Sequence, residues 1–140
     1  MTSIPEAEAA VALGEVAAAA DALVASFAAH DRTAYFASFT PDATFVFHTS
    51  TQRFASRADY EREWASWEAD GFHVDSCEST DRRIDLVTLD VAVMTHRVRT
   101  RIAGVEETQH ERETIVFRRT SEGRWLAVHE HLSPDPERDR

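Results

Sequence analysis

The sequence predicts a single α+β domain in which helices pack on one face of an antiparallel sheet. Apolar residues recur at helical spacing in the first half of the chain, and from Phe72 onward they alternate as in β-strands. The 140 residues fit one domain, and no internal repeat or low-complexity linker divides them. We therefore expect one domain over residues 1–133 and a polar tail over residues 134–140.

The first 30 residues predict a long helix. Ser3-Ile4-Pro5-Glu6 has the form of a capping box with proline in the first turn. One helical face then carries the apolar residues Val16, Ala20, Leu23, Val24 and Phe27. Asp31 can cap a short second helix through Phe39, which Pro41-Asp42 would end.

A short strand and a third helix follow. Residues 44–48 are rich in aromatic and β-branched side chains, as strands are. Residues 56–59 have the composition of a helix start. The buried stripe of this helix would be Tyr60, Trp64 and Trp67, and Gly71 follows its end.

The remainder of the chain predicts four strands. They lie near residues 72–86, 90–102, 105–119 and 124–132. Gly104 marks one turn and residues 121–123 mark the last. Helices first and long strands afterwards are typical of the α+β class.

Composition and charge argue against several classes of partner. The chain has 25 acidic and 15 basic residues, all of the latter arginine, and a net charge of −10, so we expect no nucleic-acid partner. No apolar run approaches the roughly 18 residues of a membrane helix, and the N-terminus does not resemble a secretory signal. We expect a cytoplasmic protein with no membrane partner. The absence of lysine and the abundance of alanine suggest a bacterial genome rich in GC.

The motifs of several enzyme classes are missing from the sequence. It contains no glycine-rich phosphate loop, no Gly-x-Ser-x-Gly elbow, no His-Glu-x-x-His and no calcium loop. The single Cys77 cannot form an internal disulfide or a cysteine-based zinc site. These absences argue against nucleotide hydrolysis, α/β-hydrolase chemistry and zinc proteolysis, and we expect no cofactor.

His129 and His131 are the strongest candidates for metal ligands. Two histidines at i and i+2 share one face of a strand. A third ligand would have to come from His96, His110 or Glu113. The alternative, which we favour, is that these histidines only form hydrogen bonds, so the expected metal set is empty.

Arg97, Arg112 and Glu130 lie on three strands that are consecutive in the sequence. If the arginines point into a cavity, they can bind a carboxylate or an oxyanion. If they point outward, they form a surface ion-pair ladder that contributes little stability. Tyr35 and Tyr60 belong to a large aromatic set that is mostly core, but a buried tyrosine hydroxyl needs a partner.

The C-terminal stretch resembles the nuclear transport factor 2-like superfamily. The similarity is greatest to its SnoaL-like group and to the association domain of calcium/calmodulin-dependent kinase II. It rests on Arg118-Arg119, Gly123-Arg124-Trp125 and the His-x-His-x-Ser of residues 129–133, and residues 39–44 fit the first helix-to-strand junction. The resemblance implies a cone in which a strongly curved sheet wraps the first helix, leaves a pocket at its open end, and forms dimers through its outer face.

The resemblance also suggests site residues. Tyr35 matches a pocket tyrosine of the kinase association domain and Arg97 matches a pocket arginine. Two further arginine positions are Thr114 and Leu132 here, although Arg112 can partly substitute.

The catalytic positions of ketosteroid isomerase, a relative with the same fold, are not retained. They correspond here to Leu23, Phe47 and either Thr114 or Ile115. The resemblance therefore does not support steroid isomerisation by that mechanism.

The same comparison orients the last strand. It predicts that Val128, Glu130 and Leu132 face the cavity. The residues predicted to face outward are Trp125, Ala127, His129 and His131.

Together these observations predict a pocket protein that binds a small polar-aromatic or anionic molecule and forms a homodimer. Any catalysis would be proton transfer, as in an isomerase, cyclase, dehydratase or hydrolase. Glu130 would be the acid or base, with its pKa raised by Phe47 and Trp64, and Arg97 would hold negative charge. The expected ligand-binding residues are Tyr35, Phe47, Tyr60, Trp64, Arg112 and Thr114. The alternative is a non-catalytic ligand-sensing or assembly domain.

Overall fold

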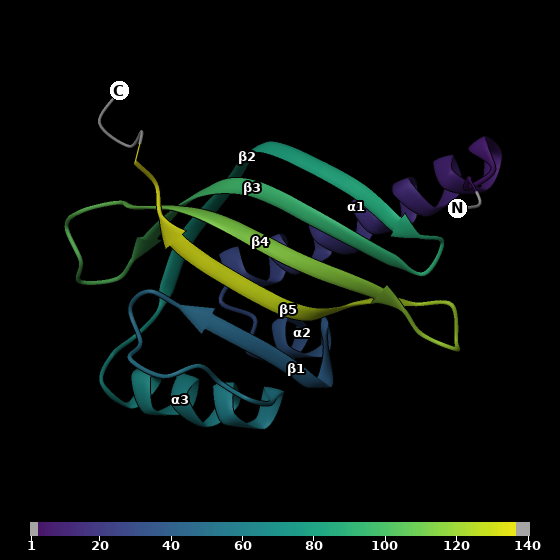
Figure 1. The fold of residues 1–140 in the computed structure, drawn as a ribbon. Helices are drawn as coiled ribbons and strands as arrows, with labels where there is room; N and C mark the ends of the chain where they lie inside the picture. The colour runs from purple at the N-terminus through teal and green to yellow at the C-terminus, as the bar shows by residue number, and fades with distance from the viewer. Residues whose placement is uncertain (1–2, 137–140) are drawn as a thin grey trace.

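Three helices and a five-stranded sheet form the structure, a computed structural model that describes residues 3–136 (Figure 1). The predicted α+β class is confirmed. The elements in chain order are α1 (Glu6–Ala28), α2 (Arg32–Ala37), β1 (Phe39–Phe47), α3 (Arg57–Ala69), β2 (Val74–Thr88), β3 (Val91–Ile102), β4 (Gln109–Arg119) and β5 (Trp125–Pro134).

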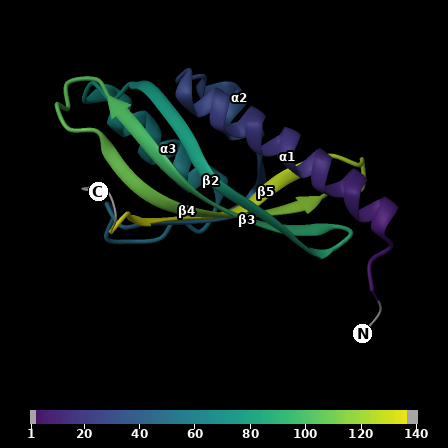
Figure 2. The same cartoon turned by 90° about the horizontal axis from the view of Figure 1, so that it is seen from above.

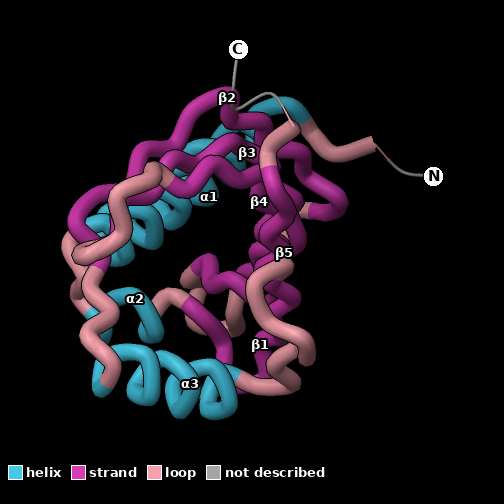
Figure 3. Tube along the Cα trace, turned by 90° about the vertical axis from the view of Figure 1, so that its left-hand side faces the viewer, coloured by secondary structure: helices cyan, strands magenta, loops and turns pink. Residues whose placement is uncertain are grey.

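The sheet has the strand order β1-β5-β4-β3-β2. Strands β2 to β5 pair antiparallel with their sequence neighbours, whereas β1 pairs parallel with β5. Helix α1 runs across the inner face of the bent sheet (Figure 2). The three helices and the sheet surround a common interior, with α3 next to β1 (Figure 3). This curvature gives the sheet distinct inner and outer faces.

Helix α1 buries the face that the sequence predicts. Ala12, Val16, Ala20 and Leu23 are buried at helical spacing. The predicted capping box is wrong, because the N-cap is Pro5 and no described side chain caps the helix. A residue before proline is restricted to extended backbone, so the helix starts only after Pro5.

Helix α1 is also long and apolar enough to span a membrane. Its best 18-residue window has a mean hydropathy of 1.6, and no other helix among residues 3–136 passes this test. The expectation that no apolar stretch of the chain approaches the length of a membrane helix is therefore wrong. A core helix of a soluble protein and an N-terminal signal sequence have the same property, so it does not assign a location.

Two of the predicted helix starts are confirmed at the level of hydrogen bonds. The Asp31 side chain accepts from the Ala34 backbone N–H at 3.2 Å, and the Ser56 hydroxyl accepts from Asp59 N–H at 3.1 Å. Helix α2 ends earlier than predicted, because Phe39 already belongs to β1. This strand is at the edge of the sheet, where Pro41 can be accommodated without a backbone donor.

The register of β5 contains a bulge that the sequence does not reveal. Val116 pairs with His129 while Phe117 pairs with Ala127, so Val128 is an extra residue. Trp125 and Ala127 are consequently buried, and their predicted outward orientation is wrong. Glu130 and Leu132 lie beyond the bulge, on the inner face as predicted.

The described end of the chain packs against the sheet. Strand β5 continues through Pro134, and Asp135 is buried and bound to Arg97. The rest of the predicted polar tail, residues 137–140, lies outside the described residues.

Candidate functional site

A cavity of about 230 Å³ opens where β1, β3 and β5 end and β4 begins. Aromatic and aliphatic side chains form much of its wall, and hydroxyl, amide and carboxyl groups interrupt them. The lining residues are Phe47, Thr49, Tyr60, Trp67, Phe72, Thr100, Ile102, Gln109, Glu111 and Leu132. A mostly apolar pocket with a few polar groups is typical of small-molecule sites, and this volume suits a small ligand.

The cavity wall carries no positive charge among residues 3–136. Glu111 is its only ionisable carboxyl group, and no described arginine lines it. Bound anions normally meet a guanidinium or another cation. The predicted anion grip is therefore not located in this cavity.

Tyr60 connects the cavity to a buried carboxyl group. Its hydroxyl lies 3.0 Å from the Tyr35 hydroxyl, and Tyr35 donates to the Glu130 Oε1 atom at 3.2 Å. Burial raises the pKa of both tyrosines well above their ordinary value, and the nearby Glu130 raises them further. Both phenols are therefore protonated and available as hydrogen-bond donors.

Glu113 and Glu130 form a hydrogen-bonded pair of buried carboxyl groups. Glu130 is 2% exposed and Glu113 is 9% exposed. Burial raises the pKa of Glu113 to about 8, with a contribution from the charge of Glu111. Burial and then the Glu113 charge raise the pKa of Glu130 well above its ordinary value, while the Tyr35 hydrogen bond opposes this. The pair therefore holds at least one proton at neutral pH.

His96 connects this pair to strand β2. Its Nε2 atom lies 2.6 Å from Glu113 Oε1, and its Nδ1 atom lies 2.6 Å from the Ser79 hydroxyl. Burial, followed by the charge of Arg82, lowers the pKa of His96 to about 4. The contact with Glu113 is therefore a hydrogen bond of a neutral imidazole and not an ion pair.

A third carboxyl group lies at the cavity itself. Glu111 lines the wall, and its Oε2 atom is 2.6 Å from His48 Nε2 in the turn after β1. The site thus contains one carboxyl group at the cavity and two behind it. Groups in such different surroundings can serve as base and acid in one reaction.

Arg97 lies on the outer face of the sheet, so the prediction that it shares the inner wall with Glu130 is wrong. Its neighbours His96 and Val98 are buried, and side chains alternate between the faces of a strand. Arg97 instead binds Asp81 at 3.2 Å and Asp135 at 2.7 Å. These carboxylates stabilise the guanidinium outside the core.

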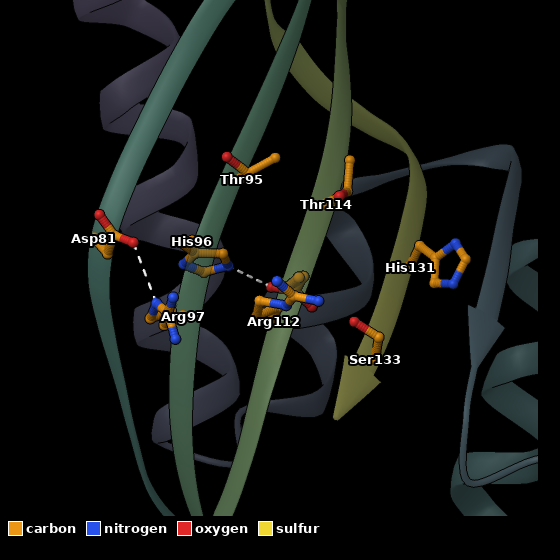
Figure 4. Close-up of a pocket in the computed structure, with 9 residues that line it drawn as sticks. Asp81, Thr95, His96, Arg97, Arg112, Thr114, His131 and Ser133 are labelled. Carbon is orange, nitrogen blue, oxygen red and sulfur yellow. Dashed lines mark hydrogen bonds and ion pairs between the residues drawn. The ribbon is translucent and has the colours of Figure 1, made fainter. Parts of the chain in front are cut away.

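Residues of β2, β3, β4 and β5 line a groove of about 450 Å³ on the outer side of the sheet (Figure 4). Its lining also includes His96 and Glu113, whose side chains are buried. Arg112 pairs with Arg97, and Thr114 pairs with Thr95, so both predicted ligand-binding residues point away from the cavity. The wall of the groove also includes His131. The register brings Arg97, Arg112 and Thr114 together as predicted, but on the opposite side of the sheet from Glu130.

The remaining predicted residues lie on the inner side. Phe47 and Tyr60 line the cavity, and Tyr35 lies beneath Tyr60. Trp64 is fully buried among aromatic rings, so it belongs to the core. Glu130 does not line the cavity and reaches it only through the two tyrosines.

No metal site is formed by the described part of the chain. No group of three His, Cys, Asp or Glu side chains that could hold an ion occurs among residues 3–136. The His129 Nδ1 atom instead lies 2.8 Å from the Thr44 hydroxyl. His129 therefore forms a hydrogen bond to β1, and the expected absence of a metal stays a prediction.

The sequence considered alone named His96 and Glu113 only as possible metal ligands and did not single out Glu111, so all three were missed as polar residues of the interior. Glu111 and Glu113 share a face of β4 with the buried Ile115 and Phe117, and His96 shares a face of β3 with buried Met94. The sequence did contain a signal for these residues. An acidic or imidazole side chain that continues an apolar face at every second position of a strand points into the interior.

The SnoaL-like domain profile matches residues 16–136. The chain belongs to the SnoaL-like family. This confirms the resemblance found in the sequence. No curated protein matches the chain significantly in sequence.

Solved structures show the same fold. A nuclear transport factor 2-like protein of unknown function from Pseudomonas putida has a TM-score of 0.76 and 19% identity, over 94% of this chain and 93% of that chain. A proposed calcium/calmodulin-dependent protein kinase II association domain from Xanthomonas campestris has a TM-score of 0.70 and 24% identity, over 88% of this chain and 87% of that chain. A protein from Novosphingobium aromaticivorans that is proposed to be a scytalone dehydratase has a TM-score of 0.78 and 12% identity, over 94% of this chain and 89% of that chain. At these identities the similarity establishes the fold.

Proposed function

We propose that this SnoaL-like protein binds a small uncharged organic molecule in the cavity beside Tyr60 and exchanges a proton with it. One observation carries the proposal. Tyr60 lines the cavity, and its hydroxyl is the end of a buried hydrogen-bonded chain that contains two carboxyl groups. Proton transfer by positioned side chains requires such a reservoir next to the bound molecule.

The cavity wall defines the class of ligand. Phe47, Trp67 and Leu132 favour an apolar or aromatic body. Tyr60 offers a donor for a carbonyl or hydroxyl oxygen, whereas Glu111 would repel an anion. A neutral ketone, enol or alcohol satisfies these conditions better than the anionic ligand considered from the sequence.

The arrangement supports isomerisation or dehydration without a cofactor. In a ketone, Glu111 accepts a proton from the carbon next to the carbonyl group, while the carbonyl oxygen receives the Tyr60 proton. A C–H bond breaks, an O–H bond forms, and the electron pair becomes a C=C bond. If the oxygen was a hydroxyl group on the adjacent carbon, its C–O bond breaks and it leaves as water. Tyr60 regains its proton from Glu130 through Tyr35, so no phenolate accumulates.

Binding is tested with neutral aromatic ketones and alcohols against matched carboxylates. We expect the neutral compounds to quench tryptophan fluorescence, because Trp67 lines the cavity. Tyr60→Phe keeps the ring and removes the hydroxyl, and should weaken binding by roughly five- to tenfold, the value of one hydrogen bond. Arg97→Ala on the outer face is the control and should leave binding unchanged.

Chemistry is tested by incubating the bound ketones in D₂O. Deuterium should enter the carbon next to the carbonyl group, detected by proton NMR. Glu111→Gln should slow this incorporation by about 100-fold, as expected for loss of a general base. Binding without incorporation would leave the non-catalytic alternative, and equal binding of ketones and carboxylates would contradict the proposed ligand class.

A further inference from the structure

The buried polar chain has a second end at the edge formed by α1 and β2. Arg82 donates to the Ser79 hydroxyl at 3.2 Å, and its other terminal nitrogen lies 2.5 Å from Asp21 on α1. The Asp21 side chain is 70% exposed. The chain that starts at Tyr60 therefore ends near solvent on the other side of the core.

A bulge in β2 creates this second end. Thr80 pairs with Arg97 and Arg83 with Thr95, which leaves one extra residue on β2. Asp81 has a φ of 52°, in the left-handed region. Immediately before the bulge the odd-numbered residues of β2 point inward, and after it the even-numbered residues do. Arg82 therefore lies on the same side as Ser79, while Asp81 binds Arg97 on the outer face.

We propose that Ser79, His96, Glu113, Glu130, Tyr35 and Tyr60 form a proton relay between the cavity and the solvent at the α1–β2 edge. The proposal deepens the proposed function, because the relay would resupply the same cavity hydroxyl. Every link is a hydrogen bond, and the four links other than the Glu113–Glu130 contact are 2.6 to 3.2 Å long.

One passage along the relay moves one proton. For this passage the Tyr35 hydroxyl, which donates to Glu130 in the structure, turns toward Tyr60, and protonated Glu130 donates to Tyr35. Tyr60 then gives its proton to the ligand and takes that of Tyr35, and Tyr35 takes that of Glu130. Glu130 takes a proton from Glu113, which takes the Nε2 proton of His96. The Nδ1 atom of His96 takes the Ser79 proton, and Ser79 is reprotonated by water. One proton leaves solvent and one reaches the ligand, and the charge of the protein is unchanged. His96 ends as its Nδ1–H tautomer and must return to the Nε2–H form before the next passage.

The surroundings of His96 suit a neutral relay. Burial, followed by the charge of Arg82, keeps the imidazole uncharged, since its pKa is lowered to about 4. The Cys77 thiol on β2 is also neutral, because burial raises its pKa to about 11. Glu111 on β4 is the remaining nearby carboxyl group and raises the pKa of Glu113. His96 can therefore pass a proton by exchanging its two N–H tautomers.

A relay of this kind solves a problem that the cavity poses. A ligand that fills about 230 Å³ occupies the route by which water would reach Tyr60. A path through Ser79 returns the proton while the ligand is still bound. The structure thus separates the entry of the ligand from the entry of the proton.

The test measures exchange of the buried carboxyl protons by infrared spectroscopy after transfer to D₂O, with no ligand present. The carbonyl stretch of a protonated carboxyl group shifts on deuteration, and Glu113→Gln and Glu130→Gln assign the band. Tyr60→Phe closes the cavity end of the relay. In that background, Ser79→Val should slow exchange by at least about tenfold, which is ~1.4 kcal/mol in the barrier.

Ser79→Thr is the matched variant, because it has the shape of valine and keeps the hydroxyl. It should leave the rate of the Tyr60→Phe protein unchanged, as should Ser76→Val, which pairs with Arg101 on the outer face of β2. Backbone amide exchange in β3 and β4 checks that the sheet opens equally in all variants.

Equal rates for Ser79→Val and Ser79→Thr would overturn the relay, and so would the absence of a protonated carboxyl band in the wild-type protein. Because no ligand is used, a slow Ser79→Val variant supports the relay even if no ketone binds. The converse outcome is that the ketone takes up deuterium while Ser79→Val and Ser79→Thr exchange their carboxyl protons at the same rate. That result would support the proposed function and contradict the relay.

Discussion

Glu113 and Glu130 are carboxyl groups in a protein interior, where an ionised carboxylate is strongly unfavourable. Here each has hydrogen-bond partners, His96 for Glu113 and Tyr35 for Glu130, and the two carboxyl groups are hydrogen-bonded to each other. A buried polar network is stable only when its members are satisfied. Removing one partner should therefore affect the protonation of the others.

The raised pKa of Glu113 predicts a decrease in stability with rising pH. The unfolded chain releases this proton near pH 4.5, whereas the folded protein keeps it up to about pH 8. The folded state thus binds more protons in this window, so the free energy of unfolding falls as pH rises, by up to about 1.4 kcal/mol per pH unit for one proton.

His96 has the opposite effect below pH 6.5, because its folded pKa is about 4. Urea unfolding should therefore be measured from pH 6.5 to 8, where only the carboxyl pair contributes among these groups. We expect Glu113→Gln to flatten the dependence, and the exposed control Glu122→Gln to leave it unchanged. An identical slope in the wild type and Glu113→Gln would contradict the raised pKa.

Among the elements, β2 shows how one irregularity changes both faces of a sheet. Its bulge places Asp81 against Arg97 outside and Arg82 against Ser79 inside. A left-handed backbone at Asp81 makes this possible.

The backbone at Asp81 predicts an unusual order of stability. The Asp81→Gly variant should be more stable than the Asp81→Val variant, with a free energy of unfolding about 1–2 kcal/mol higher. A β-branched residue is strained at positive φ, whereas glycine is not. Both variants lose the same exposed ion pair, so their difference isolates the backbone. At Asp85, an exposed position of the same strand, valine should be the more stable variant. Valine more stable at both positions would contradict the role of the bulge.

At the scale of the whole molecule, the outer face of β3, β4 and β5 is the predicted surface for a homodimer. The face is polar here, with Arg97, Arg112 and Thr114 around a groove. Dimerisation through it stays a prediction. Arg112→Glu should weaken such a dimer in sedimentation equilibrium, whereas Arg124→Glu, in the β4–β5 turn, should not. A wild-type protein that is monomeric at all concentrations would contradict it.

The sequence by itself determined the features that depend on neighbours along the chain. Periods of 3.6 and 2 identified α1, α3 and the four long strands, and short-range hydrogen bonding located the caps at Asp31 and Ser56. Gly104 and Gly123 marked turns, where both have positive φ. These signals are local because propensity, capping and turn geometry act over a few residues.

Only the tertiary structure decided which polar residues meet in the interior. Strand β3 carries apolar residues on both faces, so periodicity could not tell whether His96 or Arg97 points inward. Bulges near Val128 and Asp81 then shift the parity of β5 and β2. The face of a residue in a sheet depends on the register of its partner strands, and a single extra residue reverses it. For this reason the fold followed from the sequence, whereas the contact of Glu113 with Glu130 required the assembled sheet.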